Sequence, residues 1–205
     1  MKYTAFLKMV TLIAACGGNS DYDHYAGPDA AHDRQGDPVH QESNRTADTT
    51  LPGVPDHPLD ETAAGWFDTV LDDYLRLSTV LVGSDAPGAA SAAARLKTSA
   101  DQLGQADFDE PVREQAAGWI GVLQARSREI ESSSDVEEQR KSYHDLSETM
   151  ISMVEAFGHR KSRLYHQRCP MVNGGNGDWL STQERIMNPY HGDRMLHCGS
   201  TVRIL

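Results

Sequence analysis

Apolar residues recur at steps of three and four from about residue 60 onward, the spacing that places side chains on one face of an α-helix. Turn and cap residues divide the pattern into four segments, which predict helices at about 60–82, 86–104, 110–131 and 134–158. The connections are short, so consecutive helices are expected to run antiparallel. The pattern therefore predicts an all-α fold, an up-and-down four-helix bundle.

Each predicted helix carries an apolar stripe, and the four stripes are expected to face one core. In chain order they are Trp66, Val70, Tyr74, Leu77 and Leu81; Ala89, Ala93, Leu96, Ala100 and Leu103; Val112, Ala116, Trp119, Leu123 and Ile130; and Val136, Tyr143, Leu146, Met150, Met153 and Phe157. Ser134 and Glu137 have the spacing of a capping box, which predicts that Ser134 caps the fourth helix. Methionine at helical spacing is usually core filler, so Met150 and Met153 are predicted to be core residues.

The last 45 residues follow a different pattern, because glycine and proline interrupt them repeatedly. Short apolar stretches near 178–180 and 202–204 are compatible with strands or turns. These residues are too few to form a core of their own. We therefore expect an irregular C-terminal segment that packs on the bundle, is cross-linked, or is organised by an ion.

The first 16 residues predict an export signal. Lys2 and Lys8 accompany the apolar run 9–15, which is too short to span a membrane and is typical of a secretory signal. The sequence Ile13-Ala14-Ala15-Cys16 resembles a bacterial lipobox, which implies lipidation of Cys16 and anchoring to a bacterial envelope membrane. The alternative is an ordinary signal with Cys16 as an unmodified thiol.

Three regions follow from these patterns: a lipoprotein signal at 1–16, a linker at 17–59 and a folded domain at 60–205. The linker is rich in Asp, Gly, Pro, Asn, Thr and His and has few large apolar side chains, which is typical of disorder. The formal net charge of −11 indicates a solvated acidic surface and gives no sign of nucleic-acid binding.

Two pairs of sulfur-bearing residues stand in mirrored order in the C-terminal segment. The first is Cys169-Pro170-Met171, and the second is Met195-Leu196-His197-Cys198. Thiolate and thioether ligands select soft ions such as Cu(I). We therefore predict a site for Cu(I) or Ag(I) formed by Cys169, Met171, Met195 and Cys198. Histidines His144, His166, His191 and His197 are candidate additional ligands, with His197 nearest in sequence and His144 projecting from the fourth helix.

Two motifs resemble domain-of-unknown-function family 3347. They are Tyr165-x-x-x-Cys169-Pro170-Met171, Trp179-Leu180-Ser181 and Ile186-x-Asn188-Pro189-Tyr190-x-Gly192-Asp193-x-Met195-Leu196-x-Cys198-Gly199 at the C-terminus, and Glu138-Gln139-Arg140-Lys141-x-Tyr143-x-x-Leu146-Ser147 in the fourth helix. Arg168 and His197 depart from the family's usual residues at their positions. Members of the family occur as secreted proteins or lipoproteins, or attached to periplasmic adaptor subunits of copper/silver efflux pumps. The resemblance implies heavy-metal handling in the cell envelope, with an efflux-pump adaptor or a metallochaperone as partner.

The main alternative is a disulfide between Cys169 and Cys198 in an interaction module that binds no metal. Export delivers the chain to an oxidising compartment, where two cysteines in an irregular segment commonly pair. Such a bridge would stabilise the fold by about 3–4 kcal/mol in the chain-entropy model. The sequence shows neither an acid partner for a Cys–His nucleophile nor a Cys-x-x-Cys motif, so no enzymatic activity is predicted.

Overall fold

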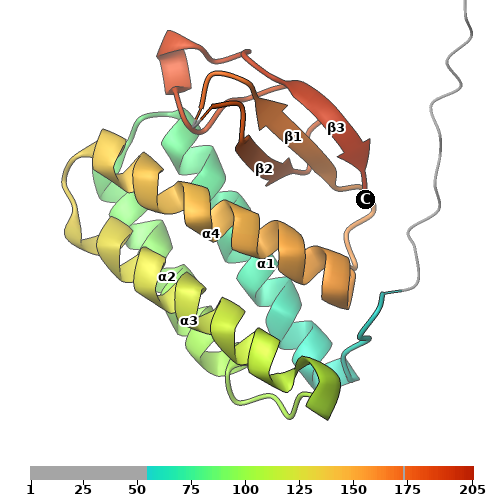
Figure 1. Cartoon of the computed structure of the whole chain (residues 1–205). Coiled ribbons are helices and arrows are strands. Elements are labelled where there is room, and N and C mark those ends of the chain that lie inside the picture. The colour runs from blue at the N-terminus through green and yellow to red at the C-terminus, as the bar shows by residue number, and fades with distance from the viewer. Residues whose placement is uncertain (1–54, 173) are drawn as a thin grey trace, which may run out of the picture. The chain divides into compact units, whose positions relative to one another are not determined.

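Four helices and a small sheet make up the described part of the chain, residues 55–172 and 174–205 of a computed structural model (Figure 1). The predicted signal peptide, Cys16 and most of the predicted linker lie outside these residues. The helices are α1 (Glu61–Val82), α2 (Ala86–Leu103), α3 (Glu110–Ser132) and α4 (Val136–Phe157). Consecutive helices pack against one another and α4 returns against α1, so the predicted four-helix bundle is confirmed.

The helix ends follow the predicted cap and turn residues, with one correction. Asp85 caps α2 by accepting a hydrogen bond from the Gly88 amide at 2.9 Å. The predicted cap of α4 was wrong: Asp135, and not Ser134, accepts the Glu137 amide at 2.8 Å. The Glu137 carboxylate does not close a capping box and bonds to arginines instead, because two guanidinium groups reach it.

The core of the bundle is formed mainly by the predicted stripes, and it also includes buried residues outside them, among them Phe67, Leu71 and Ile120. Tyr74, Leu96, Leu123 and Tyr143 are fully buried, one from each helix. Met150 and Met153 are also fully buried, which confirms them as core residues. Trp66 and Trp119 are only partly buried against the core. Within residues 55–172 and 174–205, no helix combines the length and the apolar character that crossing a membrane requires.

The C-terminal segment is more regular than its glycine and proline content predicts. It contains β1 (Tyr165–Cys169), β2 (Gly177–Ser181), the short 3-10 helix η1 (Gly192–Arg194) and β3 (Ser200–Ile204). The strands form an antiparallel sheet in the order β2-β1-β3. The sheet lies on one side of the bundle with β2 beside the helices (Figure 1). Strand pairing over large sequence separations leaves little local signal, which is why the segment looked irregular from its sequence.

A chain of hydroxyl groups joins the edge of β2 to the bundle. The Tyr143 hydroxyl donates to the Tyr74 hydroxyl at 2.9 Å, and Tyr74 lies 2.7 Å from the Ser147 hydroxyl. Ser147 in turn donates to the backbone carbonyl of Asp178 at 2.8 Å, and the amide of Leu180 donates to Tyr74 at 3.0 Å. Because a carbonyl only accepts, the single Ser147 proton points to Asp178 and the Tyr74 proton points to Ser147.

This arrangement provides partners for backbone groups of an edge strand that would otherwise be buried without them. The Tyr190 hydroxyl donates a second hydrogen bond to the Asp178 carbonyl. Burial raises the pKa of Tyr74, and raises the pKa values of Tyr143 and Tyr190 well above their usual value, so the three hydroxyls keep their protons at neutral pH. The bundle therefore holds β2 through directed hydrogen bonds as well as apolar contact.

Charge also differs between the two parts. Residues 159–205 carry seven Lys and Arg against three Asp and Glu, whereas the whole chain has a net charge of −11. Five ion pairs among the described residues link the basic segment to the acidic bundle. They are Arg160–Glu61 at 2.7 Å, Arg160–Asp68 at 2.5 Å, Lys161–Asp72 at 2.5 Å, Arg194–Glu137 at 2.7 Å and Arg203–Glu155. These pairs are largely exposed, so each adds little stability and their main effect is to favour this docking orientation.

The Tyr74→Phe substitution tests the hydroxyl chain. Removing the hydroxyl leaves the Leu180 amide without its partner, and we expect the free energy of unfolding to fall by about 1–3 kcal/mol in urea titrations. Tyr165→Phe is the matched control, because the buried Tyr165 ring has only a 3.4 Å contact between its hydroxyl and Arg163. Equal losses in the two variants would contradict this role of Tyr74.

Candidate functional site

Cys169 and Cys198, 29 positions apart in sequence, meet in the folded chain. Their Sγ atoms lie 3.2 Å apart, and both side chains are free thiols. Cys169 is the last residue of β1, and Cys198 comes just before β3, whose Ser200 pairs with Arg168. Antiparallel pairing of β1 with β3 therefore brings the two thiols together. Cys169 is fully buried, whereas Cys198 is half-buried.

Gly199 permits the close approach of the Cys198 loop to β1. Its φ of +137° lies in a region that L side chains rarely adopt. A Cβ atom there would lie 2.8 Å from the Arg168 carbonyl oxygen and 3.0 Å from the Trp179 ring. A side chain at this position would push the loop away from β1 and separate the thiols.

Asn188 fixes the loop that carries Cys198. Its side-chain amide donates to the Cys198 carbonyl at 2.9 Å, and its backbone amide donates to the Leu196 carbonyl at 2.8 Å. Its side-chain oxygen accepts the Tyr190 amide at 2.8 Å. Asn188 is fully buried, so these bonds are shielded from water.

Arg140 ties this loop to the bundle. Its Nε atom donates to the Pro189 carbonyl at 2.9 Å, and its Nη2 atom donates to the Leu81 carbonyl at the end of α1 at 2.8 Å. Glu137 balances the buried charge through a 2.6 Å ion pair with Nη1. The guanidinium group fills the space beside Gly192, where a Cβ atom would lie 2.5 Å from Nη2.

A charged cluster joins β1 to β2 next to the thiols. The buried Asp178 carboxylate accepts hydrogen bonds from Arg168 Nε, at 2.9 Å to each oxygen, and from His166 Nε2. His166 Nδ1 is buried without a hydrogen-bond partner. The cluster holds the strand that ends in Cys169, and it engages Nε2 of His166.

The two methionines lie in the turns next to their cysteines. Met171 lies in the connection from β1 to β2 and is 63% exposed. Met195 is half-buried, and its carbonyl accepts the Cys198 amide at 2.9 Å, so the two residues share one turn. Metal ligation by either thioether stays a prediction.

The candidate histidines are engaged in other bonds or apart from the thiols. His197 is exposed, with Nδ1 2.9 Å from the Ile186 carbonyl and Nε2 3.0 Å from Arg185 Nη2. His144 Nε2 lies 2.8 Å from the Asn176 carbonyl. Burial is the main cause that lowers the pKa of His191, followed by Arg194 and Arg140. Among residues 55–172 and 174–205, no group of three or more His, Cys, Asp or Glu side chains is placed to hold a metal ion.

The thiol pair has two chemistries open to it. The contact with Cys169, with a smaller effect of burial, raises the pKa of the Cys198 thiol. The Cys198 thiol therefore holds its proton at neutral pH and must release it to bind a metal ion as a thiolate. Alternatively, loss of two protons and two electrons to an oxidant would join the sulfurs as a disulfide.

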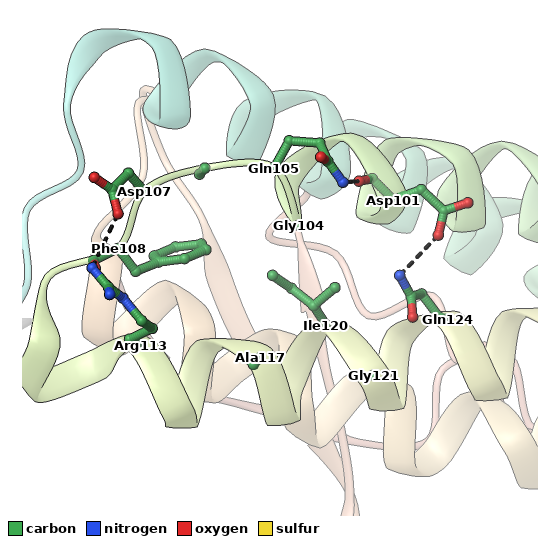
Figure 2. Close-up of a pocket in the computed structure, with 11 residues that line it drawn as sticks. Asp101, Gly104, Gln105, Asp107, Phe108, Arg113, Ala117, Ile120, Gly121 and Gln124 are labelled. Atoms are coloured by element: carbon green, nitrogen blue, oxygen red, sulfur yellow. Dashed lines mark hydrogen bonds and ion pairs between the residues drawn. The ribbon is translucent and has the colours of Figure 1, made fainter.

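A separate surface hollow of about 650 Å³ lies between the end of α2 and the facing side of α3 (Figure 2). Across it, the side-chain amide of Gln124 donates a hydrogen bond to the Asp101 carboxylate at 2.8 Å. The Arg113 guanidinium group forms an ion pair with the Asp107 carboxylate at 3.0 Å. Its lining contains no histidine or cysteine and no residue of the C-terminal segment. The hollow therefore offers no thiol or imidazole chemistry.

Sequence reasoning missed the residues that position the thiols. Arg140 lies on the buried stripe of α4, between Val136 and Tyr143. A charged residue within an apolar stripe indicates a buried side chain with specific polar partners, so this position could have been identified from the sequence. Asn188 and Gly199 stood in the C-terminal motif without an assigned role. Their function depends on contacts with chain segments far away in sequence, so spacing alone could not reveal it.

The family model described as "Protein of unknown function (DUF3347)" matches residues 70–162. The match confirms the family resemblance over most of the helical bundle, including the motif in α4. The C-terminal cysteine and methionine motif lies beyond the matched residues. No curated protein and no solved structure matches the chain.

The Gly199→Ala substitution is expected to separate the thiols. Contact with Arg168 and Trp179, added to backbone strain, should lower the free energy of unfolding by about 2–4 kcal/mol and slow oxidation of the pair by oxidised glutathione. Gly174→Ala is the control, because Gly174 has a φ of +70° but a Cβ there meets nothing within 4 Å. It should cost about 1 kcal/mol and leave oxidation unchanged. Similar behaviour of both variants would refute the close-approach role.

Alkylation of the reduced protein tests the thiol contact directly. Cys169→Ala removes the main cause of the raised Cys198 pKa, so the pH profile of Cys198 alkylation by iodoacetamide should move to lower pH. The quantity to measure is the pH at the midpoint of the profile. A change in the reagent's access to Cys198 alters the alkylation rate but leaves this midpoint where it was. A Cys16→Ser background removes the third thiol. An unmoved midpoint would show that the two thiols do not share a hydrogen bond.

Proposed function

Because residues 70–162 match a family that the C-terminal thiol motif also resembles, we propose that this protein binds a soft monovalent metal ion, Cu(I) or Ag(I). The observation that carries the proposal is the 3.2 Å contact between the Sγ atoms of Cys169 and Cys198. Two thiolates that converge in this way form a chelate for an ion that prefers sulfur.

Only a small movement would open the pair for metal binding. Two opposed metal–sulfur bonds of about 2.3 Å each span about 4.6 Å, so the sulfurs would separate by a little more than 1 Å. Cys198 can supply this movement, because it is half-buried in a loop, whereas Cys169 is buried in a strand. The half-buried position of Cys198 also provides a route for an ion to reach the pair.

Charge balance supports a monovalent ion. Two thiolates around one monovalent cation leave one net negative charge, and neutral methionine sulfurs do not change it. The neighbouring chain is basic, with Arg168 beside Cys169 and Arg194 near Cys198 in sequence. We propose that Met171 and Met195 complete or flank the sulfur shell. Met171 is exposed enough to swing toward an arriving ion.

The proposed biological setting is the bacterial envelope. A lipidated Cys16 would anchor the protein to the membrane, and residues 17–59 would connect the anchor to the metal-binding domain. The protein would buffer the ion, confer resistance to it, or hand it to an efflux-pump adaptor or a metallochaperone. The support for this setting is the lipobox and the family resemblance.

A disulfide-stabilised interaction module is the second candidate, and the same contact favours it. Closing the sulfurs from 3.2 Å to a bond of about 2.05 Å needs a movement of about 1 Å, similar to that for metal binding. Distance alone therefore does not separate the two functions. Mass spectrometry of free thiols in the protein from its native compartment does: a bridge leaves no thiols and takes up no Ag(I).

Silver titration of the reduced Cys16→Ser protein tests the metal function. We expect one Ag(I) per chain, measured by native mass spectrometry and competition titration. Cys169→Ser or Cys198→Ser should weaken binding by at least about a hundredfold, because each removes one of two thiolate ligands. Met171→Leu and Met195→Leu should weaken it several-fold.

The controls for this titration are Met150→Leu and the double serine variant. Met150 is a fully buried core residue, so its substitution should leave the affinity unchanged. Silver binding of unchanged strength in the chain without Cys169 and Cys198 thiols would exclude the proposed site. So would a reduced protein that takes up no silver.

A further inference from the structure

A second hollow, the entry groove, lies where the chain enters the bundle. It has a volume of about 910 Å³ and is bounded by the residues before α1, the beginning of α1, the end of α4 and the end of β3. The His57 amide donates to the Ala156 carbonyl at 2.9 Å and so ties the entry of the chain to α4. The wall of the groove is mainly apolar and includes Pro55, Leu59, Phe67, Val154, Phe157 and Ile204.

The charged side chains around the entry groove already pair with one another. Arg160 forms ion pairs with Asp68 at 2.5 Å and with Glu61 at 2.7 Å. Arg203 pairs with Glu155. These five are all the Lys, Arg, Asp and Glu side chains of the lining. A charged ligand would have to break one of the pairs, so the groove favours an uncharged, apolar occupant.

One polar atom of the lining lacks a partner. His159 Nδ1 accepts the Lys161 amide at 3.2 Å, so a neutral ring carries its proton on Nε2. This Nε2 atom is buried and has no hydrogen-bond partner among the described residues. A buried donor without an acceptor costs free energy, and a backbone carbonyl would satisfy it. An occupant with peptide groups therefore fits the groove better than a hydrocarbon does.

The residues that lead into the entry groove have the matching chemistry. Residues 51–54, which lie outside the described part of the chain, read Leu51-Pro52-Gly53-Val54 and contain no charged side chain. They directly precede Pro55, which lines the groove and packs against Gly158, where a Cβ atom would lie 3.3 Å from the proline ring. Because Gly158 adjoins His159, a carbonyl just before Pro55 is a candidate acceptor for Nε2.

We propose that residues 51–54 occupy the entry groove, with the side chains of Leu51 and Val54 on its apolar wall. Pro55 joins the segment to the groove, so its effective concentration there is high. Leu51 and Val54 each precede a proline, which restricts their backbones and lowers the entropy cost of ordering them. The docked segment covers Ile204, which is 45% exposed among the described residues.

This docking determines where the predicted linker leaves the domain. The folded part would begin at residue 51, and residues 17–50 would remain as the proposed connection to the membrane anchor. The connection would leave from a fixed point, at the groove where α4 and β3 both end. The inference concerns the attachment of the domain and does not depend on metal binding.

The test compares Leu51→Asp/Val54→Asp with Val39→Asp/Ala47→Asp in the reduced Cys16→Ser full chain. Both double variants add two negative charges to the predicted linker, but only the first changes the segment next to the groove. In the parent protein we expect nuclear Overhauser contacts between the methyl groups of Leu51 or Val54 and those of Ile204 or Val154, because docked side chains touch.

Two further readouts follow the loss of docking. Leu51→Asp/Val54→Asp should shift the methyl resonances of Ile204 and should speed solvent exchange of the His159 Nε2 proton at least about tenfold, because aspartate resists burial on an apolar wall. Val39→Asp/Ala47→Asp should leave both unchanged.

Absence of the methyl contacts in the parent protein would overturn the inference, and so would equal effects of the two double variants. Ile204 resonances that respond to protein concentration and not to Leu51→Asp/Val54→Asp would show that a second copy of the chain fills the groove, which also overturns it. No measurement here involves a metal ion, so failure of this inference is distinguishable from failure of the proposed function.

Discussion

The edge of β2 depends on hydroxyl groups that the bundle supplies. An edge strand carries backbone donors and acceptors that cost free energy if they are buried without partners. In this protein the Asp178 carbonyl and the Leu180 amide bond to Ser147 and Tyr74, whose side chains come from α4 and α1. The three short strands have no separate core, so their order depends on this attachment. The thiol pair depends on it in turn, because β1 carries Cys169 and pairs directly with β2.

The thiol contact also needs a second set of fixed backbone positions. Asn188 holds the carbonyl of Cys198, Arg140 holds the carbonyl of Pro189, and Gly199 lets the loop lie against Arg168. These three residues act on the backbone, so they place Cys198 without contributing a ligand. A site built in this way is largely formed before an ion arrives. The entropy cost of ordering the two thiols is met when the chain folds. An ion can therefore bind tightly although its ligands are few.

The helices could be predicted from the sequence because their signals are local. Each of these signals depends on residues only a few positions apart. They are the apolar spacing, the caps Asp85 and Gly104 of α2, and the proline in the first turn of α3. The convergence of Cys169 and Cys198 was predicted from their mirrored motifs, but the sheet that produces it was not, since its strands pair across up to about 40 positions. The Tyr74–Ser147 link and the Arg140 contacts join distant segments, so no spacing rule reveals them. The bonds of His197 to Arg185 and Ile186 likewise became visible only in three dimensions.

X-ray absorption spectroscopy of the reduced Cys16→Ser protein loaded with one equivalent of Cu(I) tests the central claim most directly. Our account predicts a first shell of sulfur alone, with two short thiolate bonds and no outer-shell scattering from imidazole. A first shell that contains histidine nitrogen, or a copper ion bound without the sulfurs of Cys169 and Cys198, would contradict it.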